Sequence, residues 1–193
     1  MSRPREYDRE EVLEKTTDLF WEKGFEATSM NEVVARTGLN KHSLYSEFGD
    51  KEKLFIDCID YYSSNSSRFV RDILARKPLG LSNIEAFFEN RVSYAASDDC
   101  KGCLIFNSVT EKETLSEEIN LRIKSRVSKI KALFYNCLKA AQERKEISGD
   151  KDCKVLADYL TCFTCGLVNF GKNETNKKEL RKMVDAALSS VRR

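Results

Sequence analysis

The chain has 193 residues, of which 41% are hydrophobic and 33% are charged, and its formal net charge is +2. A chain of this length can bury a substantial core, and this balance of residues excludes an intrinsically disordered protein. The first fifty residues hold seven basic and eleven acidic side chains, which argues against indiscriminate binding to polyanions. If the chain binds DNA, a few well-placed groups must carry the binding.

The sequence shows no sign of secretion or membrane insertion. No apolar stretch near the N-terminus suits a signal peptide, and no window reaches the apolar length that a membrane span needs. We therefore expect a cytoplasmic protein with no membrane partner. The seven cysteines are an odd number, so reduced thiols are expected rather than a complete disulfide framework.

Apolar residues recur at three- and four-residue spacing along nearly the whole chain, and only two prolines interrupt the pattern. Alternating apolar and polar runs of the kind that form strands are absent. An all-α fold is predicted. A first helix is expected to begin after its N-cap, Asp8, and to end at Gly24, and a second, short helix to follow a capping box of Ser29 and Glu32 and to end at Gly38.

A third short helix is predicted over residues 41–48, between Asn40 as its cap and Gly49 at its end. Three short helices with a glycine between the second and the third predict a helix-turn-helix. A long fourth helix is expected to begin after Asp50 and to run to about Arg76, with a larger helical body behind it. Further helices are predicted over residues 82–96, 104–112, 116–145, 152–170 and 175–191.

One stretch, from Thr28 to Leu54, carries a specific pattern of aliphatic, glycine, aromatic and lysine positions. The residues at these positions are Val33, Val34, Gly38, Leu39, Leu44, Tyr45, Phe48, Lys51 and Leu54. In this pattern the sequence resembles the DNA-binding region of the TetR family of regulators. It departs from the family pattern at His42, where glycine is usual, and at Val34, where alanine is usual. The change at His42 bears on which base step is read.

The resemblance implies that the helix over residues 41–48 enters the major groove of DNA. It implies that base edges are contacted by Lys41, His42 and Ser46. It implies that phosphates are contacted by Ser29, Ser43, Tyr45 and Lys51. Arg3 and Arg5 would reach a neighbouring groove as an N-terminal arm. The structural alternative makes Tyr45 a core aromatic and the lysines solvated surface charges.

The resemblance also implies a homodimer on a palindromic operator, with apolar residues of the last two predicted helices as the dimer surface. The candidates are Leu156, Leu160, Phe163, Leu167, Val168, Leu180, Met183, Val184, Ala187, Leu188 and Val191. The alternative is that these residues fill the core of the monomer, which the geometry of a helix face predicts for about half of them. We accordingly predict a DNA-binding domain over residues 1–52 and an effector-binding and dimerisation domain over residues 53–193. The expected function is that of a transcriptional repressor, released from its operator by a small-molecule effector or by cysteine modification.

A second, shorter resemblance concerns residues 102–104, Gly-Cys-Leu, followed by Asn107 and Glu111. It is similar to a stretch in the TetR subgroup that includes the N-ethylmaleimide reductase repressor, in which the corresponding cysteine senses electrophiles and oxidants. A place at the start of a predicted helix, with Lys101 nearby, would favour the thiolate of Cys103. The alternative is a packed core thiol, the usual fate of a free cysteine.

Apolar side chains in the body are the expected walls of an effector pocket. The aromatic candidates are Tyr61, Tyr62, Phe87, Phe88, Tyr94, Phe106, Phe134 and Phe163. Aromatic residues at helical spacing are equally expected of a core. The sequence leaves both interpretations open.

The sequence also bears on an enzyme, a metal site and a protein-interaction module as alternatives to a regulator. A helical thiol or redox enzyme lacks a base, because the single histidine, His42, lies in the predicted reading helix, so neither an enzyme nor a cofactor is predicted. Residues 100–103 and 162–165 each carry the Cys-x-x-Cys spacing of zinc ligands, but the two pairs lie far apart in the chain and no metal is predicted. A protein-interaction module without sequence-specific DNA binding remains the other alternative.

Overall fold

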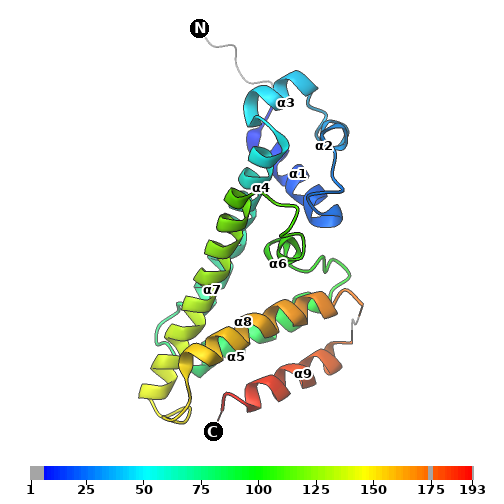
Figure 1. Ribbon diagram of the computed structural model, residues 1–193. Coiled ribbons are helices and arrows are strands. Elements are labelled where there is room, and N and C mark those ends of the chain that lie inside the picture. The colour runs from blue at the N-terminus through cyan, green and yellow to red at the C-terminus, as the bar shows by residue number, and fades with distance from the viewer. Residues whose placement is uncertain (1–6, 174–175, 193) are drawn as a thin grey trace. The chain divides into compact units, whose positions relative to one another are not determined.

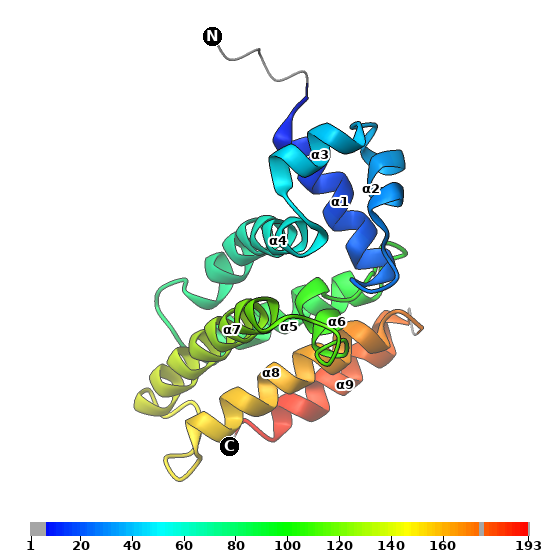
Figure 2. The ribbon, with the colours of Figure 1, turned by 45° about the horizontal axis from the view of Figure 1, so that its top comes forward.

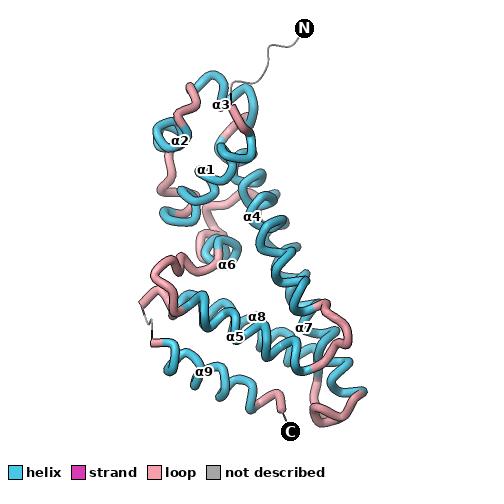
Figure 3. Tube along the Cα trace, turned by 180° about the vertical axis from the view of Figure 1, so that it is seen from behind, coloured by secondary structure: helices cyan, strands magenta, loops and turns pink. Residues whose placement is uncertain are grey.

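The computed structural model describes residues 7–173 and 176–192, and this part of the chain consists of helices joined by turns (Figure 1, Figure 3). The predicted all-α fold is confirmed. Among these residues, no helix combines the length and the apolar character that crossing a membrane requires. The helices are α1 (Arg9–Lys23), α2 (Met30–Thr37), α3 (Lys41–Phe48), α4 (Lys51–Leu74), α5 (Leu81–Ala95), α6 (Leu104–Val109), α7 (Glu117–Glu143), α8 (Cys153–Phe170) and α9 (Lys177–Ser189).

The chain divides into two compact units. Unit 1 comprises Met1–Asn65 and Leu104–Lys124, and unit 2 comprises Ser66–Cys103 and Ser125–Arg193. Unit 1 therefore contains the helix-turn-helix together with α6, a helix that the sequence had placed in the body. The boundary between a DNA-binding domain, residues 1–52, and an effector-binding domain, residues 53–193, stays a prediction.

The short helices of unit 1 begin and end where the sequence predicts. The side chains of Asp8 and Asn40 each accept a hydrogen bond of 2.8 Å from a backbone amide in the first turn of the following helix. Ser29 and Glu32 form the reciprocal capping box of α2. Gly38 ends α2 in the left-handed conformation, at φ 73°, where a side chain would be strained. Local sequence signals thus fix the lengths of α1, α2 and α3.

The core of unit 1 holds the helix-turn-helix together. The ring of Phe55 in α4 lies 4.7 Å from that of Phe20 and 5.0 Å from that of Phe25, measured between ring centroids. Val33 of α2 and Leu44 of α3 are completely buried. Helix α1 packs against α2, and α2 packs against α3, as Figure 2 shows. One face of α3 is therefore covered and the other is left outside.

Unit 2 is a helical body in which α5 packs against both α8 and α9 (Figure 1, Figure 2). Its centre is aromatic. The rings of Phe87 and Phe134 lie 5.1 Å apart, edge to face, and the ring of Phe163 lies 5.5 Å from that of Phe88. Burial of these large apolar side chains is the main contribution to the stability of this unit.

Helix α6 is shorter than predicted, since it ends at Val109 and not near residue 112. The hydroxyl of Thr110 donates to the carbonyl of Asn107 over 2.6 Å, and the amide of Glu111 donates to the carbonyl of Ser108 over 3.1 Å. Such three-residue bonds tighten the chain into a turn and compete with continued α-helix. The prediction missed the end of α6 because no glycine or proline marks it.

Candidate functional site

Helix α3 presents two different faces. Leu44 and Phe48, four residues apart, are buried in unit 1. The exposed residues are Lys41, His42, Tyr45 and Ser46. Neighbours at these spacings share one side of a helix. The structure thus brings the predicted base-reading residues together with Tyr45, which is 41% exposed and is not a core aromatic. Ser43 lies half-buried beside them.

Ser29, at the N-terminus of α2, is exposed, but its hydroxyl already has partners. It donates to Glu32 Oε2 over 2.8 Å and accepts from the Glu32 amide over 3.3 Å. Glu32 also pairs with Lys23, and the hydrogen bonds from Lys23 and from Ser29 lower the pKa of Glu32 to about 2. A phosphate at this helix end would meet that carboxylate. The phosphate contact of Ser29 stays a prediction.

Lys51, the first residue of α4, is held in a defined position. Its Nζ donates to the carbonyl of Glu26 over 3.2 Å and lies 4.5 Å from the centroid of the Phe25 ring. A cation over an aromatic face is attracted by the ring electrons. The ammonium of Lys51 is therefore anchored to the turn that follows α1.

The seven described candidates for DNA binding all belong to unit 1. Five lie on α3, one precedes α2 and one begins α4. A helix-turn-helix uses these elements to read the major groove and to hold the phosphate backbone. Arg3 and Arg5, predicted to form an arm in a neighbouring groove, lie outside the described residues. The roles of all nine residues stay predictions.

A polar network that the sequence did not reveal fixes α3 in place. Arg9 of α1 donates to Asp57 of α4 over 2.6 Å, and its Nε lies 3.2 Å from Glu47 of α3. The Tyr7 hydroxyl donates to the same Glu47 carboxylate over 2.8 Å, and the Arg9 guanidinium lies 5.1 Å from the Phe48 ring centroid. The partners are tens of residues apart, so no local pattern could identify them.

Family comparisons agree with this helix-turn-helix geometry. A model described as bacterial regulatory proteins of the tetR family matches residues 12–58, and a model described as the tetracyclin repressor-like C-terminal domain matches residues 80–189, more than half of the chain. The chain belongs to the TetR family. The predicted resemblance is confirmed, and with it the class of DNA-binding transcriptional regulators.

Individual relatives are similar over nearly the full length of this TetR-family chain. The HTH-type transcriptional regulator YezE of Bacillus subtilis (strain 168) is 27% identical over 191 residues, which is 98% of each chain. The HTH-type transcriptional repressor ComR of Escherichia coli (strain K12) is 28% identical over 188 residues, which is 96% of this chain and 90% of ComR.

Solved structures share the fold. A cysteine mutant of the TetR family regulator CifR, complexed with a 26-bp double-strand operator, has a TM-score of 0.85 and 25% identity, covering 97% of this chain and 99% of CifR. Reduced NemR of E. coli has a TM-score of 0.81 at 17% identity, covering 93% of this chain and 94% of NemR. The second likeness shows the fold alone, so membership of the N-ethylmaleimide reductase repressor subgroup stays a prediction.

The predicted effector residues of this TetR-family protein fall in both units. Those in unit 1 are Tyr61, Tyr62 and Phe106. Those in unit 2 are Phe87, Phe88, Tyr94, Cys103, Phe134 and Phe163. Phe87, Phe88 and Phe134 are buried against one another and fill the core of unit 2. Their role as walls of an effector pocket stays a prediction.

The loop that carries Cys103 is fastened by Tyr94. The Tyr94 hydroxyl donates to the Gly102 carbonyl over 3.0 Å and accepts from the Lys101 amide over 3.2 Å. Burial raises the pKa of Tyr94 to about 12, with smaller contributions in the same direction from the nearby Cys100 and Cys103. Cys103 is half-buried, and none of the seven cysteines forms a disulfide. Within the described residues, no group of His, Cys, Asp and Glu could hold a metal ion.

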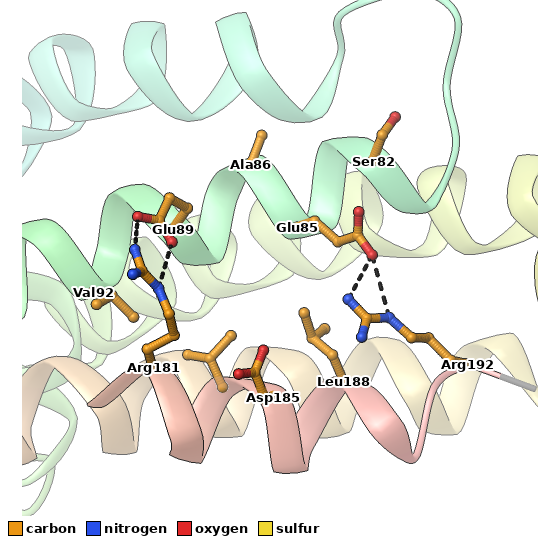
Figure 4. Close-up of a pocket in the computed structure, with 10 residues that line it drawn as sticks. Ser82, Glu85, Ala86, Glu89, Val92, Arg181, Asp185, Leu188 and Arg192 are labelled. Atoms are coloured by element: carbon orange, nitrogen blue, oxygen red, sulfur yellow. Dashed lines mark hydrogen bonds and ion pairs between the residues drawn. The ribbon is translucent and has the colours of Figure 1, made fainter. Parts of the chain in front are cut away.

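A pocket lies between α5 and α9 in unit 2 (Figure 4). Ion pairs bridge it at two places, between Glu85 and Arg192 over 2.7 Å and between Glu89 and Arg181. The remaining lining residues are Ser82, Ala86, Val92, Val184, Asp185 and Leu188. None of the predicted effector residues lines it, so this pocket and the predicted effector site are different places.

Proposed function

We propose that this TetR-family protein is a transcriptional repressor that binds a palindromic operator as a homodimer, with α3 of each copy in the major groove. The supporting observation is the outer face of α3, where polar and aromatic side chains are exposed on a helix whose inner face is anchored by Leu44 and Phe48. In this proposal Lys41, His42 and Ser46 contact base edges. Phosphates are held by Ser29, Ser43, Tyr45 and Lys51.

We place the dimer surface on α8, through residues other than those that the sequence suggested. Leu160 and Leu167 of α8, expected at the interface, are completely buried in the core of unit 2. Val155, Tyr159 and Phe170 are 63%, 39% and 49% exposed. Their spacing of four and eleven residues puts them on one side of the helix. An exposed apolar stripe of this kind is suited to a second copy of the same helix.

The body, residues 53–193 in this proposal, receives the signal and residues 1–52 bind DNA. A small molecule in the body, or modification of the Cys103 thiol, would favour a state in which the two reading helices no longer fit one operator. A ligand shifts such an equilibrium only through different affinities for the two states. In this proposal the protein acts in the cytoplasm, as a regulator and not as an enzyme.

Selection of bound sequences from a random duplex library tests this function. The proposal expects a palindrome whose half-sites are centred about 10 bp apart, or a multiple of that distance, on one face of the duplex. Light scattering of the selected complex should give two chains per duplex, or a multiple of two. Recovery of no common sequence, or of an unpaired half-site bound by one chain, would contradict the proposal.

A further inference from the structure

We infer that Glu111 is a positioning residue for DNA binding, because its carboxylate holds the turn that orients Lys51. The inference rests on the proposed contact between Lys51 and an operator phosphate. It extends the DNA-binding machinery to a residue that follows the end of α3, at Phe48, by more than sixty positions. Glu111 belongs to the sequence stretch that follows Cys103, and the function described so far gives it no role.

The first step is the contact between Glu111 and the turn after α1. The backbone amide of Phe25 donates to Glu111 Oε2 over 2.9 Å. Gly24 has a φ of 85°, and a Cβ atom placed on it would lie 2.1 Å from Glu111 Oε1. The carboxylate thus lies directly against a glycine and an amide that are more than 80 residues away in sequence. Both partners belong to unit 1.

The second step joins this turn to Lys51. The carbonyl of Glu26 accepts a hydrogen bond from Lys51 Nζ over 3.2 Å, and the Phe25 ring lies 4.5 Å from the same ammonium. Residues 24–26 therefore link the carboxylate of Glu111 to the ammonium of Lys51. Loss of the carboxylate would free the turn, and the ammonium of Lys51 would lose its fixed direction.

The third step is the rigidity of Glu111 itself. Its amide donates to the Ser108 carbonyl over 3.1 Å, and its carbonyl accepts from the amide and the hydroxyl of Thr114, each over 2.9 Å. The backbone of Glu111 is thus held on both sides, and the hydrogen bond from the Phe25 amide holds its carboxylate. Glu113, an exposed carboxylate two residues further on, provides a matched comparison.

The test measures operator affinity against salt concentration for Glu111→Ala, Glu111→Gln and Glu113→Ala, each alone and combined with Lys51→Ala. Lys51→Ala should lower the slope of log K against log salt by about 0.9, the effect of one lost phosphate contact. Glu111→Ala should weaken binding about three- to tenfold and lower the slope in the same direction. Glu111→Gln keeps an acceptor oxygen for the Phe25 amide and should recover most of the affinity, and Glu113→Ala should change nothing.

The double variant separates positioning from general destabilisation. If Glu111 acts through Lys51, Glu111→Ala should cost less than about twofold once Lys51 is already alanine, because coupled residues are not additive. An undiminished effect in that background, or equal effects of Glu111→Ala and Glu113→Ala, would overturn the inference. If Lys51→Ala alone leaves both the affinity and the salt slope unchanged, Lys51 does not contact a phosphate. The inference about Glu111 would then fail as well.

Folding is checked by thermal unfolding of each variant, and affinities are compared well below the melting temperatures. Should Glu111→Ala be too unstable, Glu111→Asp withdraws the carboxylate by one methylene and gives the same comparison. A loss of affinity for Glu111→Asp that disappears in the Lys51→Ala background supports the inference, and a loss that persists there contradicts it.

Discussion

The guanidinium of Arg9 donates a hydrogen bond of 2.6 Å to the carboxylate of Asp57 and thereby joins the start of α1 to α4. The same guanidinium pairs with Glu47 on α3. One side chain thus bridges the helix proposed to read DNA and the two helices behind it. The orientation of α3 depends on this bridge as well as on the buried residues Leu44 and Phe48.

Replacing Arg9 by alanine should therefore affect both stability and DNA binding. Its ion pairs are partly exposed, so the expected loss of unfolding free energy is only about 0.5–1 kcal/mol. Operator affinity should fall several-fold more than this loss explains, because α3 is released from α1. Urea unfolding and anisotropy titrations measure the two effects. Lys15→Ala, which breaks an exposed pair with Glu11 on the same helix, is the control, and equal results for the two variants would contradict the prediction.

The hydroxyl of Tyr45 is expected to contact an operator phosphate. Tyr45→Phe should leave the melting temperature unchanged, since the ring is 41% exposed, and should weaken operator binding about three- to tenfold, the effect of one lost hydrogen bond. The loss should be the same for all operator sequences, because phosphates carry no sequence information. Tyr135→Phe, at a half-buried tyrosine of unit 2, should bind as the parent chain does. If Tyr45→Phe binds the operator as tightly as the parent chain does, the Tyr45 hydroxyl makes no contact with a phosphate.

The lowered pKa of Glu32 predicts that the folded chain loses stability in acid. Hydrogen bonds from Lys23 and from Ser29 lower its folded pKa from 4.5 to about 2. The ionised carboxylate therefore stabilises the folded chain above about pH 4.5, and this stabilisation is lost as the pH falls from there toward 2. Glu32→Gln keeps the acceptor of the capping box but not the charge. Its melting temperature should lie below that of the parent at pH 6 and should approach it near pH 2. A constant difference over this range would show that the charge of Glu32 does not stabilise the fold.

Modification of Cys103 is expected to release DNA. The thiolate adds to N-ethylmaleimide: a sulfur–carbon bond forms, the carbon–carbon double bond of the ring becomes a single bond, and the adjacent carbon takes up a proton from water. If Cys103 is the sensor, operator affinity of the treated protein should fall about tenfold, within the usual range of coupling between sites. The Cys103→Ser variant should not respond, whereas Cys162→Ser, which removes the exposed thiol of α8, should respond as the parent does. A response that persists in Cys103→Ser would assign sensing to another cysteine.

The fold could be predicted from the sequence because its signals are local. Asp8, Ser29 with Glu32, and Asn40 are caps that act on the next few residues, and apolar spacing identifies the buried face of each helix. The exposed face of α3 follows from the same periodicity. The pairing of Arg9 with Glu47 and that of Glu111 with Phe25 depend on how distant segments meet, and no local pattern contains that information.

Periodicity also fails to separate a core from a pocket. Phe87 and Phe134 were candidates both for the wall of an effector site and for the core, and both are buried against other aromatic side chains. Leu160 was a candidate both for the dimer surface and for the core, and it lies in the core of unit 2. An apolar residue at helical spacing is equally suited to each of these places, and only the packing of the whole unit decides between them.

The most direct test of the account measures which bases α3 reads. Each position of a selected half-site is substituted in turn, and binding is compared for the parent chain and for the variants Lys41→Ala and His42→Ala. The account predicts that one or two positions cost the parent about 1–3 kcal/mol each, and that this cost disappears in one of the variants while the other positions keep theirs. A uniform weakening with an unchanged pattern of base preference in both variants would contradict the claim that α3 reads the operator.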